Sequence, residues 1–199
     1  MTLKALLGAA AIAALAACGS PDARADLPES GRVVDSILPR EEALRRFREG
    51  LAPVDSLAGG AGSRDELVAA FARAIAAADT AAIARMAVSR AEFAYLYYPT
   101  AVEGKPPYDL EPGLMWFTLY ERSNEGARKV LTRYGGHPMH LLGYDCGKGK
   151  HREDRNTMYG PCAVRWKTEA GDTVSVRLIG KILERDGRFK FLSYANPLG

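Results

Sequence analysis

Aromatic side chains with polar tips are the residues of this sequence best suited to bind a ligand. Such rings surround an apolar molecule while a hydroxyl or an indole N–H orients it through a few hydrogen bonds. The same residue types also build ordinary cores, and that interpretation stays open beside the first. The candidate pocket residues, drawn from helical and strand segments, are Tyr95, Tyr98, Trp116, Tyr120, Trp166 and Tyr194.

The three histidines, His137, His140 and His151, fall close together in the sequence. A metal site needs several converging ligands, but His137 and His140 at the start of a strand would point to opposite faces. His151 begins a charged segment, residues 151–155, that is typical of a solvated loop. We therefore predict no metal ligands and no cofactor.

Motifs and charge narrow the function further. The sequence contains no phosphate-binding Gly-x-x-x-x-Gly-Lys-Ser/Thr loop, no Gly-x-Ser-x-Gly elbow and no His-Glu-x-x-His pair. Its 27 basic and 24 acidic residues give a net charge of +3 and are mixed along the chain. A nucleic-acid-binding protein would show a clustered basic face, so nucleic acid is not an expected partner. We assign no catalytic residue and expect a non-enzymatic protein.

The N-terminus is typical of an export signal. Lys4 precedes an apolar stretch, residues 5–17, which is too short for a membrane-spanning helix of about 20 residues. Its end, Leu15-Ala16-Ala17-Cys18, resembles the lipobox of bacterial lipoproteins, and this resemblance implies cleavage before Cys18 and acylation of that residue. Two or more acyl chains anchor a protein stably. Gly19 after the cysteine favours the periplasmic face of the outer membrane. The alternative to a lipobox is a secretory signal in which Cys18 occurs by chance.

Cys146 and Cys162 are the other two cysteines, and both fall in strand candidates. In an exported chain such a pair is expected to form a disulfide. Closing a loop of about 17 residues would stabilise the fold by about 3 kcal/mol. Two free thiols or a redox pair are the alternatives, although no Cys-x-x-Cys spacing favours the redox role.

The mature chain divides into a tether, residues 18–62, and a domain, residues 63–199. The tether is rich in proline and glycine but contains a short amphipathic helix after Pro39, with Leu44, Phe47 and Leu51 on one face. That helix either packs on the domain or docks a partner.

Helices precede strands in the domain, which predicts the α+β class. Capping boxes at Ser63–Glu66 and Ser89–Glu92, Asp79, and Pro112 mark the helix starts, and the last helix has a weak point at residues 123–126 before its end near Tyr134. Strands are expected at residues 139–146, 162–168, 173–183 and 188–195, with hairpin turns between the later ones.

This order of elements resembles the nuclear transport factor two-like (ketosteroid-isomerase-like) superfamily, through residues 67–86 and the closing hairpins of residues 162–195. The resemblance implies N-terminal helices packed on a curved antiparallel sheet, a cone with an internal pocket. In catalytic members an acid–base residue faces an oxyanion donor inside the cone, and Asp145 and Tyr98 are the residues to consider for those roles. No catalytic motif of the family maps onto this chain.

The expected function is that of a membrane-anchored envelope lipoprotein. Its domain would bind a small apolar ligand or an envelope protein without catalysis. One alternative is a small-molecule isomerase, cyclase or hydrolase of the same fold, which rests on fold analogy. The other is a structural or assembly-factor lipoprotein that uses the Leu44–Phe47–Leu51 face.

Overall fold

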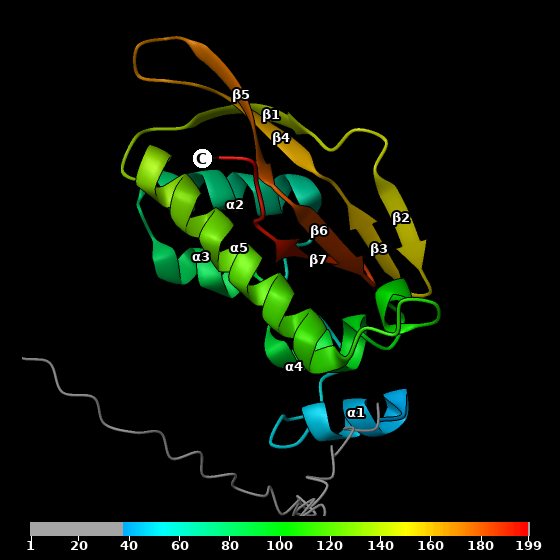
Figure 1. Cartoon of the computed structure of the whole chain (residues 1–199). Coiled ribbons are helices and arrows are strands. Elements are labelled where there is room, and N and C mark those ends of the chain that lie inside the picture. The colour runs from blue at the N-terminus through cyan, green and yellow to red at the C-terminus, as the bar shows by residue number, and fades with distance from the viewer. Residues whose placement is uncertain (1–37, 199) are drawn as a thin grey trace, which may run out of the picture. The chain divides into compact units, whose positions relative to one another are not determined.

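The computed structural model describes residues 38–198, which contain five α-helices and seven strands (Figure 1). The predicted signal, residues 1–17, and the predicted lipidation residue Cys18 lie outside the described residues. No helix in the described part of the chain is both long enough and apolar enough to cross a membrane.

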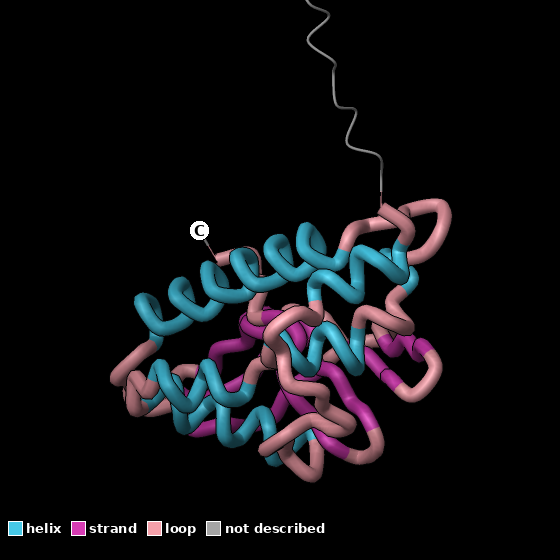
Figure 2. The backbone as a smooth tube through the Cα atoms, turned by 90° about the horizontal axis from the view of Figure 1, so that it is seen from below, coloured by secondary structure: helices cyan, strands magenta, loops and turns pink. Residues whose placement is uncertain are grey.

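The helices occupy most of the first two thirds of the described chain. They are α1 (Arg40–Phe47), α2 (Arg64–Ala76), α3 (Thr80–Met86), α4 (Arg90–Glu92) and α5 (Pro112–Tyr134). A π-helical turn, Phe93–Tyr97, continues α4, and a short 3₁₀ turn covers Val102–Gly104. The long helix α5 runs along one side of the body (Figure 2).

The predicted caps place these helices. The Ser89 hydroxyl accepts the Glu92 N–H at 3.2 Å, and the Glu92 carboxylate accepts the Ser89 N–H at 2.7 Å, which completes that capping box. At α2, the Ser63 hydroxyl accepts the Glu66 N–H as expected, but the Glu66 carboxylate instead accepts the N–H of Gly62. The capping box at Ser63–Glu66 is therefore only half formed.

Helix α5 runs through residues 123–126, the weak point of its sequence, and ends at Tyr134 as predicted. The Ser123 hydroxyl accepts the backbone N–H of Tyr194 at 3.0 Å. A Cβ atom on Gly126 would lie 2.6 Å from the carbonyl carbon of Tyr194, so only glycine allows the chain to approach this closely. These two residues hold the helix against the body, and this contact explains why poor helix formers occupy its middle.

Two antiparallel sheets confirm the α+β class. One has the order β1 (His140–Asp145), β4 (Cys162–Lys167), β5 (Thr173–Ile179). The other has the order β2 (Lys150–Glu153), β3 (Asn156–Tyr159), β6 (Lys181–Arg185), β7 (Arg188–Ser193). The expected single curved sheet is thus replaced by two. The predicted strand 173–183 divides at Gly180, whose N–H donates to the Ser193 carbonyl at 2.9 Å.

The hairpin β2–β3 occupies the segment predicted as a loop, so that part of the prediction is wrong, although four of the five side chains of residues 151–155 are exposed as expected. Its first strand, Lys150–Glu153, is polar throughout and shows no alternation of apolar and polar residues. The Cys146–Cys162 disulfide is confirmed, and it closes the loop that carries this hairpin. The link joins the end of β1 to the start of β4.

Helix α1 belongs to the compact unit, which begins at Leu38 and not at the predicted boundary, Ser63. Leu44 and Phe47 are buried, and the Phe47 ring meets that of Phe93 edge to face at 5.8 Å. Helix α1 therefore packs on the domain, the first of the two roles predicted for it, and residues 59–62 lie inside the unit. Two of the three residues of the Leu44–Phe47–Leu51 face are therefore not available to dock a partner.

A buried ion pair fixes α4 to β7. The Lys190 ammonium lies 2.9 Å and 3.0 Å from the two Glu92 oxygens, and both side chains are almost fully buried. Glu92 also accepts the N–H of Ala58 at 2.8 Å, so its charge is well compensated. This pair holds the segment before α4 beside the site described next.

Candidate functional site

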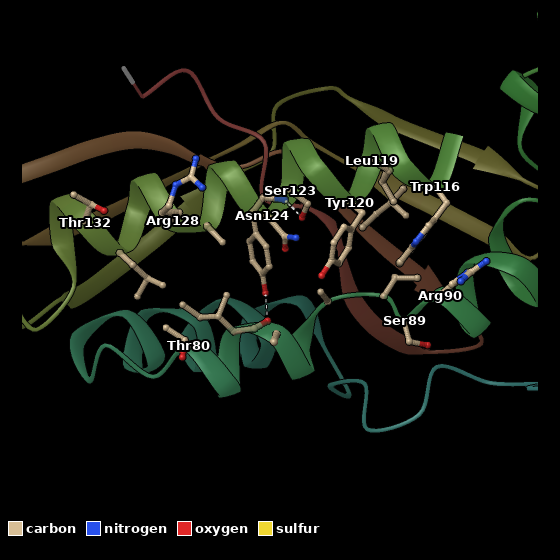
Figure 3. Close-up of a pocket in the computed structure, with 18 residues that line it drawn as sticks. Thr80, Ser89, Arg90, Trp116, Leu119, Tyr120, Ser123, Asn124, Arg128 and Thr132 are labelled. Atoms are coloured by element: carbon tan, nitrogen blue, oxygen red, sulfur yellow. Dashed lines mark hydrogen bonds between the residues drawn. The ribbon is translucent and has the colours of Figure 1, made fainter. Parts of the chain in front are cut away.

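A cleft of about 570 Å³ opens between α3 and α5 (Figure 3). Its walls are apolar: Ile83, Ala84 and Ala87 on the α3 side, and Leu119, Ala127 and Leu131 on the α5 side. Leu192 of β7 and Tyr194 lie between them. The volume falls within the range of sites for small organic molecules, about 300–1,000 Å³.

Short side chains leave this space. Ala84 and Ala87 of the α3 side and Ala127 of α5 line the cleft where longer side chains would fill it. On α5, Ala127 and Leu131 are four residues apart and therefore lie on one helix face. The alanine-rich sequence of these helices thus produces a groove as well as a core.

Tyr194 lines the cleft and is hydrogen-bonded to both α3 and α5. Its hydroxyl donates to the Ile83 carbonyl of α3 at 2.7 Å, and its backbone N–H donates to Ser123 of α5 at 3.0 Å. Its ring stacks on Phe71 at 5.4 Å. Burial raises the pKa of the Tyr194 hydroxyl well above its ordinary value. The hydroxyl is committed to Ile83 as a neutral donor and does not serve as an acid.

Two further aromatic residues line the cleft near the start of α5. The rings of Trp116 and Tyr120 stack at 5.5 Å with an angle of 28° between them. Trp116 also packs on Phe93 at 5.3 Å, which ties this end of the cleft to the core. Figure 3 shows Tyr120 pointing from α5 toward the space between the helices. An aromatic platform with a polar tip suits an apolar ligand with a polar end.

The polar residues around the cleft are hydroxyls, an amide and two guanidinium groups: Thr80, Ser89, Asn124, Thr132, Arg90 and Arg128. Among the described residues that line it, none is Asp, Glu, His or Cys. Arg90 lies over the Phe47 ring at 4.6 Å. The lining thus combines apolar walls with hydroxyl, amide and guanidinium groups, an arrangement that can bind an apolar molecule with a polar end.

Three of the six candidate pocket residues line the cleft: Trp116, Tyr120 and Tyr194. The other three lie elsewhere. Tyr95 lies beneath the guanidinium of Arg48, 4.4 Å from the ring centre. Trp166 is buried and meets Tyr134 edge to face at 5.1 Å.

Tyr98 is buried beside Arg40 of α1, and its hydroxyl donates to the Leu110 carbonyl at 2.7 Å. Burial raises the pKa of this hydroxyl, and the neighbouring Arg40 opposes that shift. Asp145 is exposed at the end of β1 and accepts the N–H of Gly147 at 2.7 Å. Neither Asp145 nor Tyr98 lines the cleft, so the acid–base pair considered from the sequence does not form a site there.

Sequence reasoning missed the aliphatic walls, because alanine and leucine at helical spacing predict a core as readily as a groove. It also missed the partner of His151, whose Nε2 lies 3.0 Å from the buried Glu153. Within residues 38–198, no three His, Cys, Asp or Glu side chains are grouped so that they could hold a metal ion.

Comparisons of this chain with known protein families, with curated proteins and with solved structures each find no match. The cleft and the N-terminal sequence are therefore the features of the chain that bear on its function.

Proposed function

We propose that this protein is a lipid-anchored component of the bacterial cell envelope that binds a small apolar ligand in the cleft between α3 and α5. The observation that carries the proposal is the cleft itself, with its aliphatic walls, its Trp116–Tyr120 platform and its volume of about 570 Å³. The Leu15–Cys18 motif supports the lipid anchor, and Gly19 supports the outer membrane.

Ligand binding is favoured over an isomerase, cyclase or hydrolase activity because of what the cleft lacks. Its described lining offers arginine and tyrosine as the ionisable side chains, and Tyr194 is already bonded to Ile83. Guanidinium groups stay protonated and move no proton at neutral pH. They can instead pair with a polar or anionic end of an otherwise apolar molecule.

The cleft is tested with N-phenyl-1-naphthylamine, an uncharged dye that fluoresces in apolar sites. Two positions of α3, Ala81 and Ala84, give a matched comparison. Both alanines are exposed, but of the two only Ala84 lines the cleft. Ala84→Trp should weaken dye binding at least tenfold, because an indole fills part of the space. Ala81→Trp, on the same helix, should leave binding within about twofold of the original, as expected for a surface change outside a site.

Equal binding by both variants, or no saturable binding by the original chain, would overturn the ligand-binding proposal. Native mass spectrometry of the chain purified from its membrane then identifies a bound molecule through its added mass. Circular dichroism of each variant confirms that the helices are retained.

The anchor is tested separately by growing cells with radioactive palmitate. The original chain should carry the label and remain with the membrane fraction, and Cys18→Ala should lose both properties. A Cys18→Ala chain that is still labelled would show that Cys18 is not the acylated residue.

A further inference from the structure

Exposed apolar side chains concentrate in one short stretch of the chain. Of the seven large hydrophobic residues that are exposed in the described body, six fall within residues 102–120. Phe117 is 62% exposed, Tyr108 66% and Leu114 55%. We call this group the 102–120 patch: Val102, Tyr108, Leu110, Leu114, Phe117 and Tyr120. Exposed large hydrophobic side chains gathered in this way mark a place of contact.

The helix α5 presents part of the patch as a regular stripe. Leu114 and Phe117 are three residues apart, which places them on one side of the first turns, and Leu110 lies just before the helix. Met115 of the same turns is buried in the core. At this end, α5 therefore carries apolar side chains on two faces. The described body covers the face with Met115 and leaves the face with Leu114 and Phe117 exposed.

The patch lies close to the residue at which the body begins. Arg40 donates hydrogen bonds to the carbonyls of Tyr98 and Pro99 at 3.1 Å and 3.0 Å. The Tyr98 hydroxyl in turn donates to the Leu110 carbonyl. Two hydrogen-bonded steps therefore link the first turn of α1 to the patch, and α1 lies beside the N-terminal end of α5 (Figure 1).

We propose that the 102–120 patch rests in the interfacial layer of the bilayer that anchors the chain. This inference depends on the proposed acylation of Cys18. Residues 18–37 are too few to separate Leu38 from the anchor by more than about 70 Å, even when fully extended. The patch is therefore held at a high local concentration next to the membrane.

The composition of the patch fits lipid better than a charged partner. Tyrosine and phenylalanine with leucine suit the boundary between acyl chains and headgroups. The flanking charges are Glu103, Asp109, Glu111 and Glu121 against Lys105 and Arg122, four acids and two bases. Such a segment gains nothing from anionic headgroups, so contact should depend on apolar burial and be insensitive to salt.

The test uses the chain from residue 18 with Cys18→Ser, so that no acyl chain contributes, and vesicles of phosphatidylcholine. Flotation should show measurable binding that raised salt does not weaken. Leu114→Ser combined with Phe117→Ser should lower the partition coefficient at least tenfold. Leu142→Ser removes the exposed hydrophobic residue outside the patch, which lies on β1, and should change it less than twofold.

Equal partition of the double variant and Leu142→Ser would overturn the proposal. A second outcome would also overturn it: the original chain does not bind vesicles, sediments as a dimer, and becomes a monomer in the double variant. The patch would then join two copies of the chain. Because the chain is not acylated, failure here leaves the palmitate result untouched. The dye experiment on Ala84→Trp likewise tests the cleft independently of the patch.

Discussion

The two halves of α5 meet their surroundings in different ways. In the C-terminal half, residues 123–134, Ser123 and Gly126 contact the backbone of Tyr194, and Val130 is fully buried. In the N-terminal half, residues 112–120, Leu114 and Phe117 are more than half exposed. We call these the closed half and the open half of the helix.

Within this one helix, different residues stabilise the fold and remain exposed for contact. The closed half uses a hydroxyl and a glycine, poor helix formers, because the tight contact with Tyr194 requires them. In the open half, Leu114 and Phe117 contribute little to folding, since they remain largely in water. Substitutions of Ser123, Gly126 or Val130 should therefore change the free energy of unfolding, and those of Leu114 and Phe117 should change contact with the membrane.

The sharpest test is one substitution made in both halves. Gly126→Ala should lower the free energy of unfolding by about 3 kcal/mol, because its Cβ would overlap the backbone of Tyr194. Gly113→Ala, where a Cβ meets nothing within 4 Å, should leave stability unchanged or raise it by up to about 1 kcal/mol through helix propensity. Urea denaturation measures both, and equal effects would remove the distinction between the halves.

Truncation of an apolar side chain gives the next largest contrast. Val130→Ala should cost about 2 kcal/mol, because it removes two methyl groups from a fully buried site and leaves a cavity. Leu114→Ala removes more atoms but should cost less than about 0.5 kcal/mol, because those atoms already face solvent. A larger cost for Leu114→Ala, measured as a shift of the urea midpoint, would mean that the open half is covered.

Tyr194, which is hydrogen-bonded to both the closed half and α3, should have a smaller, pH-dependent effect on the free energy of unfolding. Tyr194→Phe removes the hydrogen bond to Ile83 and should cost about 1 kcal/mol at neutral pH. Because the folded pKa of Tyr194 is raised, the unfolded chain loses this proton first, near pH 10. The stability that the neutral hydroxyl provides is full below that pH and is lost as the pH rises above it.

The difference in unfolding free energy between the original chain and Tyr194→Phe should therefore shrink between neutral pH and about pH 11. Tyr144, whose burial and hydrogen bond to Asp65 raise its pKa to about 12, contributes equally to both chains. A difference that stays constant with pH would contradict a buried neutral hydroxyl at position 194.

Local chemistry in the sequence predicted most of the helices. Ser89 and Asp79 mark helix starts because the backbone N–H groups of a first turn need partners within a few residues. Pro112 marks a start because it has no N–H to satisfy. The close contact at Gly126 was not predictable, since its partner, Tyr194, is 68 positions away. The division at Gly180 and the polar strand β2 depend likewise on pairing between distant segments.

The candidate site was half predictable for a related reason. Aromatic residues are few and conspicuous, and Trp116, Tyr120 and Tyr194 do line the cleft. Trp166 and Tyr98 have the same chemistry but are buried on other sides of the body. Residue type shows what a side chain can bind, whereas helix packing determines whether it meets open space.

The smallest expected effect on folding belongs to the residues proposed to contact lipid. Leu114→Ser with Phe117→Ser should change the free energy of unfolding by less than about 0.5 kcal/mol, because both side chains are mainly in water in the folded chain. Urea denaturation without vesicles measures this, and a cost near that of Val130→Ala would show that a contact within the chain covers the open half. An unchanged midpoint together with lost vesicle binding would instead assign these side chains to the membrane surface.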